Sequence, residues 1–317
     1  MRAWRALRFG SYREVLAIEN VPPPEVRGDD VLVRIRTAGI NFPDTLIIAG
    51  KYQMLPPLPF TPGLEAFGER DDDGERVMCW SGGTGAFAEF IAVPPEHLFR
   101  VPPAMSDTEA AAFLTSFQTA YLALSHRAGL KRDEVLLVHG GAGALGSAAI
   151  QLGKVLGATV IATAGTAEKL AICRRLGADA AIDHSGGDIA AAVRAVSARG
   201  ADVIFDPIGG ALLERSLRTA APEGRILILG FTSGVIPSIA ANRILLRNVS
   251  LVGFYWGDYW KHNPARIREA EAALAALYER GSIRPLVGKE FAFDRLPDAL
   301  DATIDRANYG KNVLLVG

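Results

Sequence analysis

Cysteine is scarce in this sequence, and the chain carries almost no net charge. Its 317 residues include only two cysteines, Cys79 and Cys173, too few for a disulfide framework or a four-cysteine zinc site. A formal net charge of −1 offers little attraction to a polyanion, so we expect neither a nucleic-acid nor a membrane partner. No uniformly apolar stretch reaches the roughly 18 residues that a membrane-spanning helix needs.

Targeting signals are also missing from the sequence. The first residues, 1–5, lead into no apolar segment of the kind that a signal peptide carries. The scarcity of cysteine favours a reducing compartment, so we expect a cytoplasmic protein. We interpret both cysteines as inert, because neither has the positively charged setting that lowers a thiol pKa.

The N-terminal third has the pattern of short strands. Apolar residues alternate with more polar ones over 31–36, as in a half-buried strand, and glycine clusters such as 81–83 mark turns. Ser106 and Glu109 then have the spacing of a capping box. The alanine-rich run after them predicts a helix over roughly 106–128.

From residue 133 onward, strand and helix patterns alternate. This alternation predicts crossover connections and a parallel α/β sheet with helices on both faces. The predicted strands are 135–139, 159–164, 180–183, 203–205, 225–229 and 250–254, and the predicted helices are 144–156, 167–176, 189–198 and 212–221.

The C-terminal part returns to the texture of the first third. A long alanine-rich helix is predicted after 262, ending near Gly281, followed by an apolar segment, a helix near 296–306 and a final strand at 313–316. We therefore expect two domains, which suits the length of the chain. The first spans 1–123 and is completed by 263–317, and the second spans 124–262.

A glycine-rich turn lies between the first strand and the first helix of the second domain. Gly141, Gly143 and Gly146 have the spacing of a dinucleotide-binding turn. The first glycine allows the tight turn, the second lets the backbone approach a pyrophosphate, and the third lets helix and strand pack closely. The helix N-terminus, with Ala144 and Leu145, then presents N–H groups to the phosphates.

The end of the next strand indicates which dinucleotide is bound. Residues 163–166, with Thr163 and Gly165, contain no Asp or Glu to meet a ribose 2′-hydroxyl. Lys169 follows closely and could bind a 2′-phosphate, and His184 comes after the following strand. The sequence therefore favours NADPH over NADH, although Lys169 could equally be a solvated helix lysine.

As a whole, the sequence resembles the zinc-free quinone oxidoreductases of the medium-chain dehydrogenase/reductase superfamily. The similarity runs nearly from end to end. It is carried by segments 38–44, 59–65, 119–121, 138–146, 168–170, 176–179, 206–210, 252–257 and 310–311. The resemblance implies a Rossmann NADP-binding domain and a β-rich, GroES-like catalytic domain.

Zinc-dependent members of the superfamily differ from this chain at two ligand positions. They have Cys where this chain has Asn41 and His where it has Leu64, and they carry a four-cysteine lobe that is missing here. Asn and Leu cannot replace thiolate and imidazole as zinc ligands. We therefore expect no metal.

The resemblance also implies roles for single residues. Asn41 and Asp44 match polar residues beside the nicotinamide in the catalytic cleft, and Tyr52 matches an aromatic residue of the substrate pocket. Lys169 matches a lysine that meets the 2′-phosphate, and His184 stands where the family often has Tyr. The remaining matches to cofactor-contacting residues are Thr119, Phe231, Phe254, Tyr255, Trp256 and Lys311.

Several of these residues have a plain structural alternative. Asp44 could cap a helix that starts after Pro43, and Tyr52 could be packing at the edge of a pocket. Tyr255 and Trp256 could serve a subunit contact. We interpret His139, after the first strand of the second domain, as structural.

The expected reaction is hydride transfer from NADPH to a quinone or a similar flat, electron-poor acceptor. The cofactor carries the chemistry, and donors such as the Asn41 amide would meet the developing charge. One alternative is reduction of an activated alkene, with Tyr52 or Tyr121 as proton donor. Another is a non-catalytic, crystallin-like NADPH-binding protein. A homodimer through the edge strand 250–254 is also expected.

Overall fold

The computed structural model describes residues 1–186, 188–305 and 307–317, and the chain divides into two compact units. Unit 1 comprises Met1–Thr115 and Pro285–Gly317, and unit 2 comprises Ser116–Arg284. Residues 116–123 and 263–284 thus group with unit 2, whereas the sequence assigned them to the first domain. One reason is Gln151 of unit 2, whose amide bonds to the backbone N–H and carbonyl of Arg284 at 2.8 and 2.9 Å.

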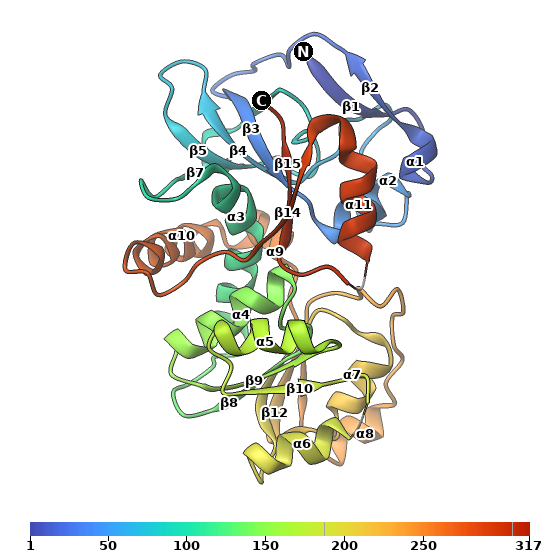
Figure 1. Ribbon diagram of the computed structural model, residues 1–317, viewed down its shortest axis with the longest axis vertical. Helices are drawn as coiled ribbons and strands as arrows, with labels where there is room; N and C mark the ends of the chain where they lie inside the picture. Colours follow the sequence, from blue (N-terminus) through green and yellow to red (C-terminus); the bar gives the residue numbers. More distant parts are fainter. Residues whose placement is uncertain (187, 306) are drawn as a thin grey trace. The chain divides into compact units, whose positions relative to one another are not determined.

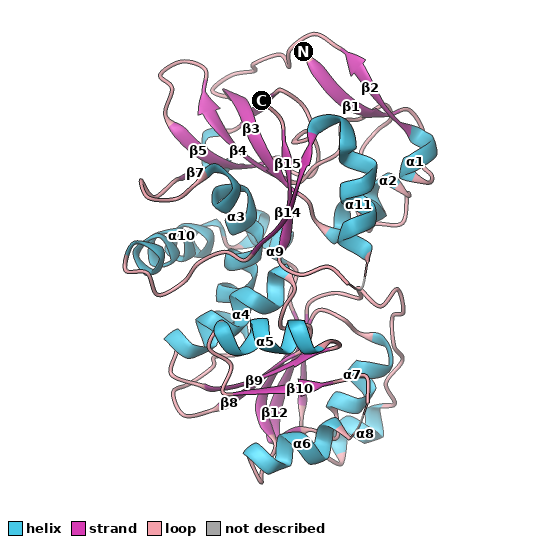
Figure 2. Ribbon diagram, in the orientation of Figure 1, coloured by secondary structure: helices cyan, strands magenta, loops and turns pink. Residues whose placement is uncertain are grey.

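Unit 1 is built on a mainly antiparallel sheet (Figures 1 and 2). Over the described residues its order is β14-β15-β3-β4-β5-β7, with β6 paired to β3, and β1-β2 forms a separate ribbon. The strands are β1 (Arg2–Ala6), β2 (Leu16–Asn20), β3 (Val31–Gly39), β4 (Glu65–Arg70), β5 (Arg76–Trp80), β6 (Phe90–Val93), β7 (Leu98–Arg100), β14 (Val287–Ala292) and β15 (Lys311–Leu315).

The predicted alternation in the first third is confirmed in β3. Val33 and Ile35 are fully buried, whereas Arg34 between them is exposed. The C-terminal return is also confirmed, because β15 pairs antiparallel with β3. Val33 and Ile35 pack in one core with Leu314 of β15 and Phe293. The two ends of the chain therefore share a single hydrophobic core in unit 1.

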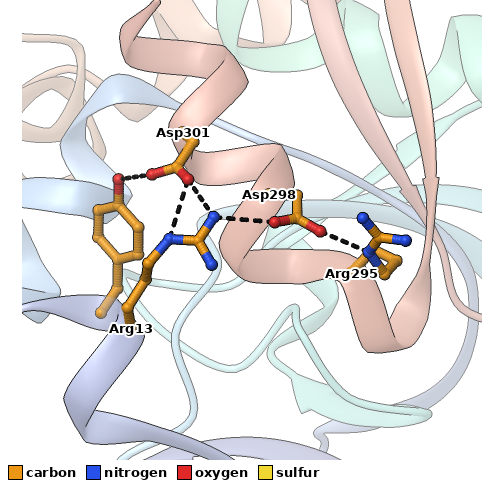
Figure 3. Close-up of polar contacts among 5 residues, drawn as sticks. Arg13, Arg295, Asp298 and Asp301 are labelled. Atoms are coloured by element: carbon orange, nitrogen blue, oxygen red, sulfur yellow. Dashed lines mark hydrogen bonds and ion pairs between the residues drawn. The ribbon is translucent and has the colours of Figure 1, made fainter.

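Two terminal helices of unit 1 are joined by a polar network (Figure 3). The helices are α1 (Tyr12–Val15) and α11 (Leu296–Ile304), and the unit also contains α2 (Phe42–Ile48) and short turns at Pro95–His97 and Phe293–Arg295. The Tyr12 hydroxyl and the Arg13 guanidinium both donate to Asp301, and Arg13 also donates to Asp298 at 2.8 Å. Burial and the bond to Asp301 raise the pKa of Tyr12 to about 12. Arg306, the expected last residue of α11, lies outside the described residues.

Helix α3 (Asp107–Tyr121) begins at the predicted capping box. The Glu109 N–H donates to the Ser106 hydroxyl at 3.2 Å, and the Ser106 N–H donates to the Glu109 carboxylate at 3.1 Å. A π-helical segment, Leu122–Arg127, continues the helix. Together they cover the span that the sequence predicted as one helix.

Unit 2 is a parallel sheet with helices on both faces. Its order over the described residues is β10-β9-β8-β11-β12-β13, and Figure 2 shows α4 and α5 on one side of it and α6 and α8 on the other. The strands are β8 (Val135–Val138), β9 (Thr159–Ala164), β10 (Ala180–Asp183), β11 (Ala201–Asp206), β12 (Ala220–Ile228) and β13 (Ser250–Gly253). The helices are α4 (Ala144–Val155), α5 (Ala167–Arg175), α6 (Ile189–Val196), α7 (Gly210–Ser216), α8 (Ala241–Leu245), α9 (Trp256–His262) and α10 (Pro264–Glu279).

The predicted doubly wound sheet is therefore confirmed, and its central strands are buried on both faces. Leu136, Leu137 and Val138 of β8 have no exposed surface. One boundary was wrong: the helix predicted over 212–221 ends at Ser216. The residues after it turn into β12, where Ala220 pairs with Ala201 of β11. Tertiary pairing overrides the helical propensity of the alanines there. No helix in the described part of the chain is long and apolar enough to cross a membrane.

Candidate functional site

The glycine turn of unit 2 connects β8 to α4 and is held by its own backbone. The Gly141 N–H donates to the Thr163 carbonyl at 2.9 Å, and the Gly143 N–H donates to the Gly140 carbonyl at 2.9 Å. Gly143 is the N-cap of α4 and has no side chain to cap it. The first N–H groups of a helix have no partner within it, so Ala144, Leu145 and Gly146 present donors at a positive helix end.

Added side chains would disrupt this turn. A Cβ atom at Gly146 would lie 2.2 Å from the Gly140 carbonyl oxygen, and one at Gly141 would lie 2.8 Å from the Cys173 sulfur. At Gly143 the nearest atom would be the Gly140 oxygen at 3.3 Å. The first and third glycines therefore allow close packing, and the second leaves room above the backbone. This geometry fits a bound pyrophosphate.

Behind the turn, a buried histidine ties three elements together. His139 Nε2 lies 2.7 Å from the Ser216 hydroxyl of α7, and Nδ1 lies 3.1 Å from the Thr163 hydroxyl of β9. The Ser216 hydroxyl donates to the Leu212 carbonyl at 2.9 Å, so we assign the ring proton to Nε2 and make Thr163 the donor to Nδ1. Burial lowers the pKa of His139 to about 3. This neutral imidazole fits the structural interpretation of His139.

Thr163 consequently differs from its expected role. Its side chain is fully buried, its hydroxyl is bonded to His139, and its carbonyl holds the N–H of Gly141. The residue therefore supports the glycine turn from below and does not offer its side chain to a ligand.

The end of β9 leads into α5, where Thr166 is the N-cap, as predicted. The Thr166 hydroxyl accepts from the Lys169 N–H at 3.3 Å. Gly165 lies against His184, because a Cβ built at Gly165 would be 3.2 Å from His184 Nε2. The His184 N–H bonds to the Ala164 carbonyl at 3.1 Å. Lys169 and His184 thus both belong to the segments that flank the end of β9.

The turn after β11 places Phe231 beside a glycine whose backbone has a positive φ. The Asp206 carboxylate accepts the N–H groups of Ile208 and Gly209 at 2.7 and 2.9 Å, and burial raises its pKa. Gly209 has a φ of 68°, and a Cβ there would lie 2.6 Å from the Phe231 ring. No role was predicted for Asp206, although it begins one of the matching segments.

The other expected cofactor contacts of unit 2 differ in exposure. Thr119 of α3 is buried, with 8% of its surface exposed, and Tyr255 is 40% exposed. Phe254 packs against Tyr259 with ring centroids 5.1 Å apart. Trp256 is buried, and its Nε1 donates to Gln118 Oε1 at 3.2 Å. Trp256 therefore anchors α9 to α3 within unit 2.

Unit 1 contains a buried polar cluster of Asn41, Asp44, Glu65 and Lys311. The Lys311 ammonium at the start of β15 lies 2.5 Å from both Glu65 Oε1 and Asn41 Oδ1. Glu65 Oε2 accepts from the Thr115 N–H at 2.8 Å. Lys311 and Glu65 are only 3% and 1% exposed, so their charges must neutralise each other. The cluster joins β15, β4 and the segment that begins α2.

The Asn41 amide is fully engaged inside this cluster. Its Nδ2 donates to Glu65 Oε1 at 2.9 Å and to the Gly39 carbonyl at 3.3 Å, and its Oδ1 accepts from Lys311. The expectation that the Asn41 amide would donate to an acceptor does not fit this arrangement, because an amide nitrogen has only two hydrogens. Lys311, expected to contact the cofactor, lies beside Asn41 in this cluster.

Asp44 has a local role at the start of α2, but not the one expected. The helix begins at Phe42, and its N-cap is Asn41. The Asp44 carboxylate accepts from the Asn41 N–H at 2.7 Å, reaching back from the third helical position. Asp44 is fully buried, and this burial raises its pKa to about 7 against the lowering effects of the Asn41 N–H and Lys311.

Glu65 is the residue of unit 1 that sequence reasoning missed. It lies in a matching segment, but nothing local shows that it is buried. Its neighbours in the sequence gave one indication. An acidic residue at the start of a strand, shortly after Pro-Gly, can be buried only if a cation pairs with it. The partner, Lys311, lies 246 positions later in the sequence.

Two expectations remain, namely that Tyr52 lines a substrate pocket and that the protein holds no metal. Tyr52 is partly buried and packs against the cluster of Ala6, Ile47 and Phe60. Within residues 1–186, 188–305 and 307–317, no group of three or more His, Cys, Asp or Glu side chains is placed to hold a metal ion.

Comparisons with known proteins agree with this two-unit architecture. The family model for the alcohol dehydrogenase GroES-like domain matches residues 27–103, and the model for zinc-binding dehydrogenases matches 144–276. Fold and sequence together define an oxidoreductase of the medium-chain dehydrogenase/reductase superfamily.

Relatives narrow this class further. Quinone oxidoreductase-like protein 2 from Bos taurus is 38% identical, over 99% of this chain and 93% of its own length. The homolog from Nematostella vectensis is 36% identical, over 99% and 89%. The quinone oxidoreductase of Thermus thermophilus, solved alone and with NADPH, has a TM-score of 0.89 and 34% identity with full coverage of both chains. The chain belongs to the quinone oxidoreductase-like family of the superfamily.

Proposed function

We propose that this protein is an NADPH-dependent oxidoreductase that reduces quinones without a metal. The observation that carries the proposal is the glycine turn between β8 and α4, followed by a second strand whose end, 163–166, has no carboxylate. An acidic residue there would repel a ribose 2′-phosphate. The relatives support the acceptor: the Escherichia coli quinone oxidoreductase in complex with NADPH has a TM-score of 0.92 and 25% identity.

Unit 2 would bind the dinucleotide through backbone and side-chain donors. The N–H groups of Ala144, Leu145 and Gly146 would meet the pyrophosphate at the positive end of α4. Lys169 and His184 would meet the 2′-phosphate with charge-assisted hydrogen bonds. When bound, the nicotinamide supplies the hydride, and the reduction of a quinone to a quinol takes up one further proton.

Unit 1 would contribute a rigid, buried polar cluster. Lys311, Glu65 and Asn41 bond to one another, so the Asn41 side chain is held in one orientation. Thiolate and imidazole are the usual zinc ligands of such enzymes, and the Asn41 and Leu64 positions supply neither.

The test is an acceptor panel with the purified protein and NADPH. We expect NADPH oxidation with para-benzoquinone and related quinones, and little or none with simple alcohols and aldehydes. The rate should be unchanged by a chelator such as EDTA. If NADPH is oxidised only with enones or acyl thioesters, the protein reduces activated alkenes and the quinone proposal is wrong. Tight NADPH binding without turnover on either panel would point to a non-catalytic binding protein.

A further inference from the structure

His139 follows β8 at the place where the strand order of unit 2 reverses. From β8 the chain continues to β9 on one side, and from β11 it continues to β12 on the other side. In sheets of this kind the loops after the two central strands diverge, and a dinucleotide lies between them. The His139 N–H bonds to the Phe205 carbonyl of β11 at 3.0 Å, so the residue joins the two central strands at this place.

The imidazole ring of His139 connects the two sides. On one side, Nδ1 lies 3.1 Å from the Thr163 hydroxyl of β9. The Thr163 carbonyl accepts the N–H of Gly141, which begins the glycine turn. On the other side, Nε2 lies 2.7 Å from the Ser216 hydroxyl of α7. One ring therefore links the turn assigned to the pyrophosphate to the helix that follows β11.

The opposite end of α7 lies against the loop that contains Phe231. The helix begins at Gly210, whose N–H bonds to the Val235 carbonyl at 3.1 Å. A Cβ at Gly209, just before the helix, would lie 2.6 Å from the Phe231 ring. With seven residues, α7 is about 10 Å long. The short helix thus connects the bond made by His139 to a loop that the resemblance places at the cofactor.

The three polar side chains of this chain of hydrogen bonds are buried. His139 and Thr163 have no exposed surface, and Ser216 has 1%. Burial lowers the pKa of His139 to about 3, so the ring is neutral and has one donor and one acceptor nitrogen. Both nitrogens are used, and solvent does not reach them. Removing one partner therefore leaves a buried polar group unsatisfied, which is costly.

We propose that His139 is a positioning residue for cofactor binding, which holds the glycine turn and α7 in register through Thr163 and Ser216. It acts through these two partners and does not touch the cofactor itself. If the turn also adopts other geometries, the apparent Kd rises as the fraction in the binding geometry falls. This inference rests on the proposed function in one respect, namely that the glycine turn binds the pyrophosphate.

The experiment is calorimetric titration of threonine variants with NADPH. Thr163→Val keeps the shape of the side chain but removes the hydroxyl, and we expect the Kd to rise about two- to ten-fold, as for the loss of one hydrogen bond. Thr163→Ser keeps the hydroxyl and should bind NADPH nearly as the wild type does. The matched control is Thr37→Val in β3 of unit 1. It removes an equally buried hydroxyl, which donates to the Asp107 carbonyl at 2.8 Å, and should leave the Kd unchanged.

Two further measurements separate positioning from a general loss of stability. Thr163→Val and Ser216→Ala interrupt the same chain of hydrogen bonds, so their effects on the Kd for NADPH should not multiply. The double variant should bind less than about two-fold more weakly than the weaker single variant. Adenosine 2′-monophosphate, which has no pyrophosphate, should bind to every variant with the wild-type Kd.

Other outcomes overturn the proposal. If Thr163→Val is less stable to urea but binds NADPH as the wild type does, His139 only supports the fold. The proposal also fails if Thr163→Ser binds as weakly as Thr163→Val, if the two effects multiply, or if adenosine 2′-monophosphate is weakened equally. Should Thr163→Val not fold, Ser216→Ala with the same two ligands gives the same decision. A wild type that does not bind NADPH would contradict the proposed function as well.

Discussion

At Gly146, a single added carbon would lie 2.2 Å from the Gly140 carbonyl oxygen. Both groups belong to the backbone of the glycine turn, so neither can move aside as a flexible side chain would. Gly253 is different, because a Cβ there would meet nothing within 4 Å. The two glycines therefore form a matched pair for testing whether the turn binds the cofactor.

Gly146→Ala should lower the free energy of unfolding by about 1–3 kcal/mol through overpacking. It should also raise the Kd for NADPH strongly, because α4 must move away from the turn that holds the pyrophosphate. Urea unfolding and fluorescence titration with NADPH measure the two effects. Gly253→Ala should leave both unchanged. A folded Gly146→Ala variant that binds NADPH as tightly as the wild type would contradict the assigned role of the turn.

Residues whose partners are local or near in sequence were the predictable ones. The glycine turn, the Thr166 cap and the Ser106–Glu109 capping box all follow from spacing, and the structure has each of them. The engagement of the Asn41 amide could not be predicted in this way. It depends on Lys311, 270 positions away, and no local pattern shows which buried charges meet.

At the scale of elements, β13 forms one edge of the sheet in unit 2. Among the described strands it pairs with β12 alone. The Phe254 N–H donates to the Ile228 carbonyl, so by alternation the Leu251 N–H faces the open edge. Arg127 donates to the Gly253 carbonyl on this edge at 3.1 Å, and backbone groups that no strand pairs, such as the Leu251 N–H, can pair with another copy. We propose that a homodimer forms through this strand.

The dimer proposal predicts distinct effects of two changes at Leu251. Leu251→Pro removes the outward donor and should shift the mass measured by light scattering from about twice 33.8 kDa toward 33.8 kDa. Leu251→Ala loses the same side chain but keeps the N–H, so it should remain a dimer. A wild-type monomer at micromolar concentration would contradict the proposal, and so would a Leu251→Pro dimer.

Elements were predictable from the sequence where apolar periodicity was strong. The alternation of strands and helices from 133 onward predicted the strands β8 to β13 and the helices α4 to α7 with moved boundaries, but it did not predict α8 and α9. The start of β12 at Ala220 was missed because it depends on pairing with Ala201. The grouping of α10 with unit 2 was missed for a similar reason, since it rests partly on the bonds of Gln151 to Arg284.

At the scale of the whole molecule, two buried groups act on stability in opposite directions with pH. Burial raises the pKa of Asp44 from 3.8 to about 7. Its contribution to the free energy of unfolding is therefore present below pH 4 and is lost as pH rises through 7. Burial lowers the pKa of His139 from 6.5 to about 3. Its contribution is present above pH 6.5 and is lost as pH falls toward 3. Each contribution corresponds to roughly 4 to 5 kcal/mol.

Between about pH 4 and pH 6.5 the two effects should nearly cancel in the wild type. Asp44→Asn keeps an acceptor for the Asn41 N–H and removes the titration, so its stability should fall steeply as pH falls through this range. His139→Gln should show the opposite slope. Urea unfolding at several pH values measures both slopes, with Asp294→Asn, at an exposed carboxylate, as the control. Equal slopes in the two variants would contradict the assigned burial of these groups.

We propose that the glycine turn and the carboxylate-free end of β9 bind NADPH, and that the bound NADPH reduces a quinone. The most direct test is calorimetric titration of the wild type with NADPH and with NADH, followed by addition of a quinone to the NADPH complex. We predict a Kd for NADPH at least about ten-fold lower than for NADH, and oxidation of the bound NADPH by the quinone. Equal or tighter binding of NADH, or NADPH that no quinone oxidises, would contradict the claim.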